Sequence, residues 1–217
     1  MENMTTDVYK DFLSKLVQEE DEIKKQLNTR RKPYEEKNEK KALKEELLSD
    51  GWEVVKEFKT TYKYRKQKSF HQYFQDRLWC LAAMMGFSTL NNDNYLLLPC
   101  NKNTSIPGRQ VDVLAADDET VLIIECKSCK EETSKSMQNV INDFNTIKEG
   151  SFVHLRSIFG DRKVKFILAT ENIVLNENDK KRLEEFNGIT YFNEQDIAYY
   201  EQLVAQIGHA AKYQLLG

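Results

Sequence analysis

The sequence predicts an α/β fold in which a mixed central sheet is flanked by helices and preceded by an N-terminal helical extension. Three observations lead to this prediction. Strand-like and helix-like hydrophobic patterns alternate from residue 52 onward. The segment VLIIECK, residues 121–127, is apolar on both parities, as in a strand covered on both faces. The chain has 217 residues and 40% hydrophobic content, enough for one substantial core plus an appendage.

Residues 1–50 are predicted to form the helical extension, and residues 51–217 the main domain. Apolar residues spaced three and four apart over residues 5–28 indicate an amphipathic helix. After Pro33, residues 34–48 are almost wholly Glu, Lys, Asn and Leu, which is typical of a solvated helix. Two interpretations stay open. In the first, the helices pack on their own domain. In the second, they serve as a lid or join copies of the chain into a homo-oligomer.

A strand-like pattern starts at WEVVKEF and runs into the basic stretch KEFKTTYKYRKQK, residues 56–68. Six cations accompany one acid there, and three aromatic residues are interleaved. Such a stretch can follow a phosphate backbone or stack on bases. Alternatively, it is an exposed edge strand or loop whose lysines prevent aggregation between sheets. The residues expected to contact DNA are Lys59, Lys63, Arg65, Lys66 and Lys68, with Arg109 further along the chain.

The remaining elements follow in a regular order. A buried helix over residues 71–86 ends at Gly86 and contains one acid, Asp76. The later elements are expected as a short strand within 91–99, hairpin strands at 110–115 and 121–127, a helix at 136–150, a strand at 163–172, a helix at 176–188, a strand at 189–194 and a helix at 195–217.

The predicted hairpin contains the candidate catalytic residues. If its turn is centred on Asp118 and Glu119, paired positions sum to 237, which sets Asp112 opposite Glu125. Because side chains alternate along a strand, Lys127 shares the face of Glu125. Two carboxylates at this spacing repel each other unless a proton or a cation lies between them. A hard divalent cation such as Mg²⁺ suits the pair, and this chemistry supports phosphodiester hydrolysis.

These motifs resemble the PD-(D/E)xK nuclease superfamily over about residues 70–200: a helix with an acid, a Gly-Phe exit, a G-x-x-x-D strand start and an apolar strand ending E-C-K. The resemblance implies a restriction-endonuclease-like fold and a deoxyribonuclease that uses Mg²⁺ or Mn²⁺ to hydrolyse DNA. It implies that Asp112, Glu125 and the backbone carbonyl of Cys126 bind the metal. Lys127 would position the attacking water or help to deprotonate it.

The same resemblance extends to two further residues. Asp76 lies where many members carry an acid on the first core helix, and Gln138 resembles a glutamine that some members place near the site. More narrowly, the segments GWEVVKEFKTTYKYRK and FQDRLWCLAAMMGFSTLN resemble the nuclease-like N-terminal region of DGQHR-domain proteins, which implies a context of mobile elements, defence or DNA modification. The alternative is an inactive nuclease-fold module for DNA binding or protein assembly.

Composition limits the remaining choices. The N-terminal residues lack a signal-peptide pattern and no apolar run approaches about 18 residues, so we expect a cytoplasmic protein with no membrane partner. The net charge is −3, so contacts with phosphate must be local. Cys126 and Cys129 form one CxxC without a second ligand pair, and we interpret the four cysteines as reduced structural thiols.

Overall fold

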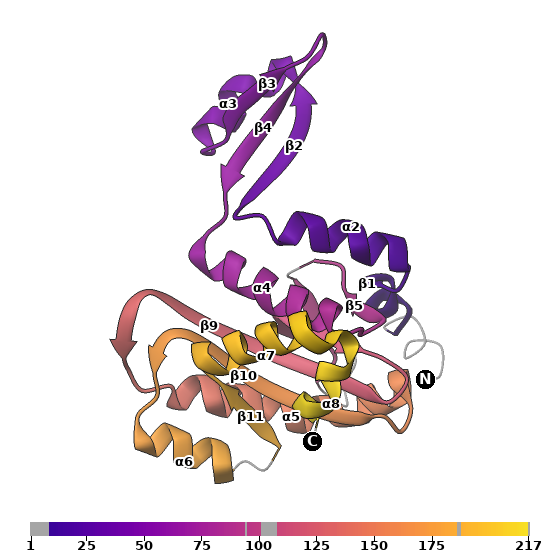
Figure 1. The fold of residues 1–217 in the computed structure, drawn as a ribbon, viewed down its shortest axis with the longest axis vertical. Coiled ribbons are helices and arrows are strands. Elements are labelled where there is room, and N and C mark those ends of the chain that lie inside the picture. The colour runs from indigo at the N-terminus through magenta and orange to yellow at the C-terminus, as the bar shows by residue number, and fades with distance from the viewer. Residues whose placement is uncertain (1–8, 94, 101–107, 186–187, 217) are drawn as a thin grey trace.

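The computed structural model describes residues 9–93, 95–100, 108–185 and 188–216. A six-stranded sheet with helices on both faces forms the body of the molecule, and a three-stranded sheet projects from it (Figure 1). The predicted α/β class, with a mixed central sheet flanked by helices, is confirmed.

The central sheet has the strand order β1-β5-β8-β9-β10-β11. Its strands are β1 (Leu16–Val17), β5 (Thr89–Asn91), β8 (Val113–Ala116), β9 (Thr120–Ser134), β10 (Lys163–Val174) and β11 (Ile189–Phe192). The pairs from β1 to β9 are antiparallel, whereas β9, β10 and β11 are parallel to one another. A separate antiparallel pair, β6 (Leu96–Leu98) and β7 (Arg109–Val111), leads into β8.

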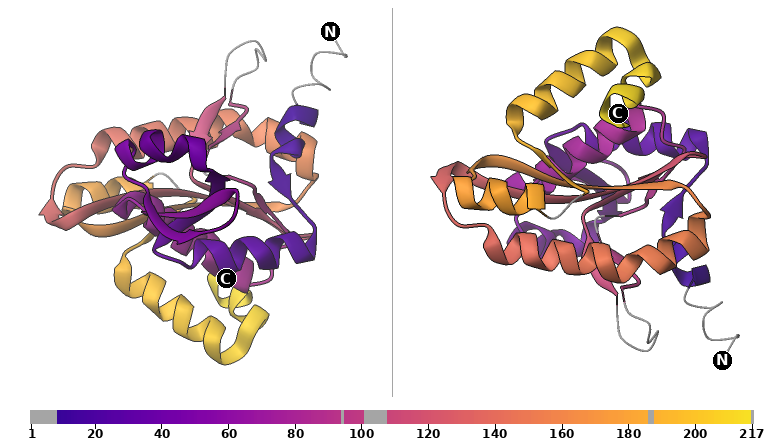
Figure 2. Two further views of the ribbon diagram at one scale, coloured as in Figure 1. Left: turned by 90° about the horizontal axis from the view of Figure 1, so that it is seen from above. Right: turned by 90° about the horizontal axis from the view of Figure 1, so that it is seen from below.

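Helices cover both faces of the central sheet (Figure 2). The first face carries α4 (Phe70–Met84), α7 (Glu194–Ile207) and α8 (Ala211–Leu216), and a core that includes Trp79, Ile124 and Cys126. The second face carries α5 (Gln138–Phe159) and α6 (Glu177–Glu185), with Ile123 and Phe144 in its core. This is why the 121–127 segment is apolar on both parities.

The helix α4 is positioned by its ends. The hydroxyl of Ser69 accepts a hydrogen bond from the backbone N–H of Gln72 and caps the helix. Gly86, with φ of +85°, ends it in the left-handed conformation that glycine adopts without strain. The predicted buried helix over 71–86 is therefore confirmed, and its first turns lie close to the central hairpin, as described below.

The N-terminal region is where the sequence-based expectation is wrong. Residues 9–14 are helical, but β1 then interrupts the predicted helix and pairs with β5, and α2 (Glu20–Arg30) follows. Residues 5–8 of that prediction lie outside the described residues. Ile23 and Leu27 of α2 pack against the core on the α4 side, so this helix lies on its own domain. Self-association through this region stays a prediction.

Residues 34–48 do not form the predicted solvated helix. They form β2 (Tyr34–Lys40), a short 3₁₀ turn (Lys41–Leu43) and α3 (Lys44–Ser49), and β2 pairs with β4 (Thr61–Gln67) along its whole length. The cross-strand partners explain the difference, since the Glu36 carboxylate meets Lys63 and Arg65 of β4. Pairing with a distant strand outweighs the helix preference of Glu and Lys.

The projecting sheet has the order β2-β4-β3, with β3 at Glu53–Glu57. Most of the basic stretch forms β4, the central strand, so the interpretation as an edge strand is wrong for residues 61–67. Lys56 does lie on the edge strand β3, and Lys59 lies in the loop between β3 and β4. The predicted boundary between residues 50 and 51 falls inside this sheet, because β2 and β4 pair across it.

Candidate functional site

The β8–β9 hairpin has the predicted register. Its pairs run from Val113 with Ile124 to Ala116 with Val121, each summing to 237. The turn is fixed by Asp117, whose Oδ1 accepts hydrogen bonds from the backbone N–H groups two and three residues further on, at 2.9 and 2.8 Å. Asp112 directly precedes β8, at a bend between β7 and β8, and the printed pairs of the hairpin end at Val113 and Ile124.

Asp112 is anchored at the point where β8 meets β9. Its side chain is 5% exposed, and its Oδ2 accepts a hydrogen bond of 2.7 Å from the backbone N–H of Cys126. An amide donor from the neighbouring strand fixes the carboxylate, because a buried carboxylate requires partners. The observed contact is made by the Cys126 amide, and the predicted role of its carbonyl as a metal ligand stays a prediction.

Glu125 and Lys127 lie on the same face of β9. Their neighbours Ile124 and Cys126 belong to the core on the α4 side, whereas Ile123 belongs to the core on the α5 side. The Lys127 Nζ donates a hydrogen bond of 2.5 Å to Glu125 Oε1. The Glu125 side chain is 14% exposed and the Lys127 side chain 32% exposed, so solvent reaches the pair.

The electrostatics of the three groups are coupled. Burial raises the pKa of Asp112, although the Cys126 amide and the Lys127 charge act in the opposite direction. Burial, and next the Asp112 charge, raise the pKa of Glu125 to about 7. Burial works against the charged form of Lys127, yet the nearby carboxylates keep its pKa above the ordinary value. Burial and mutual repulsion therefore disfavour the charged forms of the two carboxylates, and one ammonium group lies beside them.

Helix α4 contributes residues that were not predicted. The Gln75 side chain is 6% exposed, and its Nε2 donates to Asp112 Oδ1 at 2.5 Å. The same Nε2 lies 3.0 Å from His71 Nε2, and His71 Nδ1 lies 3.3 Å from the Ser128 hydroxyl oxygen on β9. The i, i+4 spacing of His71 and Gln75 shows that they share a helix face. The sequence does not show that this face turns toward the hairpin.

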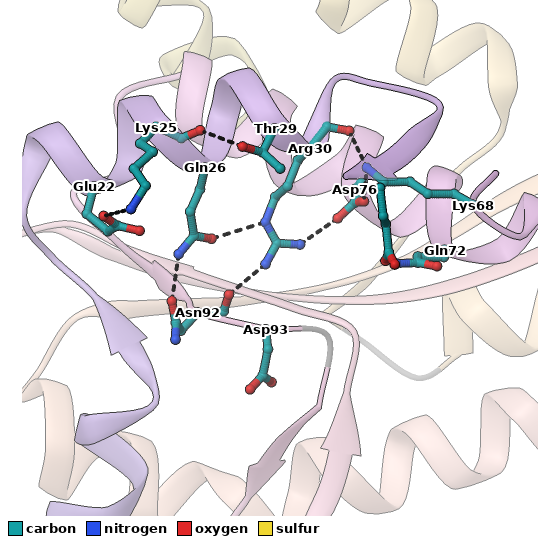
Figure 3. Close-up of a pocket in the computed structure, with 11 residues that line it drawn as sticks. Glu22, Lys25, Gln26, Thr29, Arg30, Lys68, Gln72, Asp76, Asn92 and Asp93 are labelled. Carbon is teal, nitrogen blue, oxygen red and sulfur yellow. Dashed lines mark hydrogen bonds and ion pairs between the residues drawn. The ribbon is translucent and has the colours of Figure 1, made fainter. Parts of the chain in front are cut away.

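Asp76 is not part of this group, contrary to the expectation for the helix acid. Its Oδ1 accepts from Arg30 at 2.5 Å and its Oδ2 from Lys68 at 2.7 Å, and all three side chains are at most 10% exposed (Figure 3). The expected DNA contact of Lys68 is likewise wrong, since its ammonium is buried in this ion cluster. Charges that are buried together need such pairing.

The other predicted residues lie on other elements or in loops. Lys63 and Arg65 both bind Glu36 on the projecting sheet, and Lys66 lies 5.9 Å from the centre of the Trp52 ring. Lys59 lies between β3 and β4, and Arg109 is exposed at the start of β7. Gln138 is the exposed first residue of α5. The α5 residue that acts on the hairpin is Asp143, whose charge adds to the rise of the Glu125 pKa.

The donors at the hairpin suit a hard divalent cation. Asp112 and Glu125 offer carboxylate oxygens, and the Cys126 carbonyl belongs to the same strand end. In the part of the chain that the structure describes, no three histidine, cysteine, aspartate or glutamate side chains gather in a way that could hold a metal ion. A cation here would therefore depend on two carboxylates, backbone oxygen and water, which is a coordination that Mg²⁺ accepts.

Comparisons with known proteins add little to this site. No protein-family model and no curated protein matches the chain. Among solved structures, the chain is similar to "Crystal structure of protein VC1899 from Vibrio cholerae", with a TM-score of 0.38 and 11% sequence identity. The match covers 96% of this chain and 57% of that chain, and at this TM-score it carries no argument. Of the described helices, none has the length and apolar character needed to cross a membrane.

Proposed function

We propose that this chain is a divalent-metal-dependent nuclease that hydrolyses DNA phosphodiester bonds at Asp112, Glu125 and Lys127. One observation carries the proposal: the Asp112 carboxylate accepts a hydrogen bond from the backbone N–H of Cys126, the residue after Glu125, and the Lys127 ammonium lies 2.5 Å from Glu125. The D…E-x-K motif and its resemblance to the PD-(D/E)xK superfamily supply DNA as the substrate.

Each side chain has a distinct role in this proposal. Asp112 and Glu125 hold the metal, with the Cys126 carbonyl as a further oxygen ligand. When bound, the metal supplies Lewis-acid stabilisation of the phosphate and a lower pKa for water. The Lys127 ammonium orients the attacking water and stabilises the negative charge that builds up on the phosphate oxygens. The attacking water gives up a proton as its oxygen bonds to phosphorus, the P–O bond to the leaving alkoxide breaks, and the alkoxide takes up a proton in its place.

The partners of these groups support the geometry. Asp112 is hydrogen-bonded on one oxygen by the Cys126 amide and on the other by Gln75, so its carboxylate has little freedom to rotate. Residues that fix a metal ligand in this way commonly change metal affinity by about 10–100-fold when they are removed.

The direct test is cleavage of supercoiled and linear DNA by purified protein with Mg²⁺ or Mn²⁺, compared with EDTA. We expect wild-type cleavage, and a loss of at least about a hundredfold in Glu125→Gln and in Lys127→Met, the size expected for losing one group that stabilises the transition state. The matched controls are Glu131→Gln and Lys130→Met, exposed residues of the same strand, which should retain full activity.

Two outcomes contradict the proposal. Cleavage that persists at the wild-type rate in both site variants would place the chemistry elsewhere. Wild-type protein that binds DNA without cleaving single-stranded or double-stranded DNA under any of these metal conditions would instead favour the inactive DNA-binding module.

A further inference from the structure

The projecting β2-β4-β3 sheet has one face whose charge is not balanced. On this face, Glu36 is approached by three cations: Arg65 at 2.9 Å, Lys63 at 3.0 Å and Lys32 at 3.4 Å. Arg65 first, and then Lys63, hold the pKa of Glu36 down to about 2, so this carboxylate is charged at neutral pH. Glu53 of β3, the cross-strand partner of Arg65, is a second carboxylate on this face, and Lys56, the partner of Lys63, is a fourth cation. Two negative charges thus face four positive charges, and Lys32, Lys63 and Arg65 are each more than 30% exposed.

Lys63 and Arg65 do not have the role of protecting an edge strand. Lysines often protect an edge strand from pairing with another chain, but Lys63 and Arg65 lie on β4, which has β2 on one side and β3 on the other. Tyr64, between them in sequence, is fully buried on the opposite face of the sheet. Figure 1 shows α3 lying beside β3 on this sheet.

The charged face is hollowed where the sheet meets α2. A cavity of about 240 Å³ is lined by Thr29 at the end of α2 and by residues of the sheet and its approach, among them Lys32, Tyr34, Asn38 and Lys63. The Arg65 guanidinium lies over the Tyr34 ring at 3.9 Å. Lysine and arginine groups beside an aromatic ring form the kind of surface that holds phosphates and flanking nucleotides.

We propose that this face, defined by Lys32, Tyr34, Asn38, Lys63 and Arg65, is a docking surface for the phosphodiester backbone of a nucleic acid. The proposal rests on the proposed function for the identity of the ligand. The sheet is joined to the body directly before α4, whose first turns carry the Gln75 contact to Asp112 (Figure 1). The surface would hold a nucleic acid near the N-terminal end of α4, the end that carries Gln75 and contacts the hairpin.

The test measures binding without cleavage. Fluorescence anisotropy of labelled single-stranded DNA, duplex DNA and RNA is recorded in EDTA over a series of NaCl concentrations. Wild-type protein should bind, and its affinity should fall as salt rises, because binding releases counterions from the phosphates. The double variant Lys32→Gln/Lys63→Gln keeps the Arg65–Glu36 pair. It should bind about tenfold more weakly, with a salt slope smaller by roughly one to two.

Two further variants make the result specific. Asn38→Glu removes no ion pair and adds a negative charge to the cavity, so it should weaken binding while the melting temperature stays that of the wild type. Lys180→Gln/Lys181→Gln makes the same change in net charge on α6, at the opposite end of the molecule (Figure 1), and should bind as the wild type does.

The outcomes separate this proposal from the nuclease proposal. Wild-type affinity and salt slope in both face variants, or no binding by the wild type to any of the three nucleic acids, would overturn the docking surface. Cleavage by wild-type protein together with unaltered binding by the face variants would overturn the surface alone. Binding that the face variants lose, in a protein that never cleaves, would support the surface and contradict the nuclease.

Discussion

At the scale of single residues, Asp112 is the centre of the site. Its two oxygens are held from different elements, by the Cys126 amide on β9 and by Gln75 on α4. If Gln75 Nε2 donates one hydrogen to Asp112 and the other to His71 Nε2, then His71 Nδ1 carries the proton and donates it to Ser128. Hydrogen bonds thus connect the first two turns of α4 to Asp112, before β8, and to Ser128 on β9.

We predict that Gln75 controls metal binding. Gln75→Leu removes the hydrogen bond to a buried carboxylate and should weaken Mn²⁺ binding by about tenfold, within the range known for groups that orient a ligand. Gln75→Glu adds a third carboxylate beside Asp112 and should strengthen Mn²⁺ binding. Isothermal calorimetry gives both affinities, and the rise in melting temperature on adding Mn²⁺ gives an independent measure.

The matched control for this prediction is Gln72→Leu, one turn earlier on α4, whose amide binds Glu35 instead. It should leave Mn²⁺ affinity unchanged. If Gln75→Glu weakened metal binding while Gln75→Leu had no effect, Gln75 would be a packing residue and Asp112 would not be a metal ligand.

The β8–β9 register and the shared face of Glu125 and Lys127 could be predicted from the sequence, because a tight turn and side-chain alternation fix them locally. The placement of Asp112 directly opposite Glu125 stays a prediction. The residue on α4 was predicted wrongly. Asp76 and Gln75 are neighbours that point in different directions, and the rotation of a helix about its axis depends on packing with distant elements. The Arg30 side chain that captures Asp76 comes from a segment far away in the chain.

At the scale of elements, the buried ion cluster joins the projecting sheet to the body. Arg30 is the last residue of α2 and lies shortly before β2, and Lys68 directly follows β4. Both segments that connect the sheet to the body are therefore bound to Asp76 of α4. Arg30 is further held by Gln26 and by the backbone carbonyl of Asn92 (Figure 3). The sheet is thereby fixed at its base.

We predict that Asp76 is a structural residue. Asp76→Asn leaves two cations in a buried cluster without their counter-charge and should lower the free energy of unfolding by about 3 kcal/mol or more. Urea denaturation followed by tryptophan fluorescence measures this change. The control Asp161→Asn removes an exposed pair with Arg156 and should cost less than about 1 kcal/mol.

A metal-binding role for Asp76 would give the opposite pattern. The folding free energy would then change little, and the affinity for Mn²⁺ would fall sharply. Under the structural role, folded Asp76→Asn protein retains the Mn²⁺ affinity of the wild type, which the same calorimetry measures.

At the scale of the whole molecule, the chain is an α/β body with a small sheet inserted between α2 and α4. The alternating strands and helices after residue 70 could be predicted from hydrophobic period, because the pattern of each element is local. The inserted sheet could not. β2 has the composition of a solvated helix, and only its pairing with β4, which follows in the chain after α3 and β3, makes it a strand.

The two proposals assign separate tasks to the hairpin and to the inserted sheet. The hairpin β8–β9 presents carboxylates and an ammonium for chemistry, while the inserted sheet presents surplus positive charge on one open face. α4 lies between them, with Asp76 turned to the base of the sheet and Gln75 to the hairpin. We therefore expect binding and hydrolysis to be separable by substitution.

We propose that Asp112 and Glu125 together bind a divalent metal, and anomalous scattering from crystals soaked in Mn²⁺ shows whether they do. We expect an anomalous peak between the two carboxylates, within about 2.5 Å of an oxygen of each, as hard cations require. The peak should be absent from Glu125→Gln crystals soaked in the same way. Wild-type crystals that bind Mn²⁺ elsewhere and show no peak between Asp112 and Glu125 would contradict this claim.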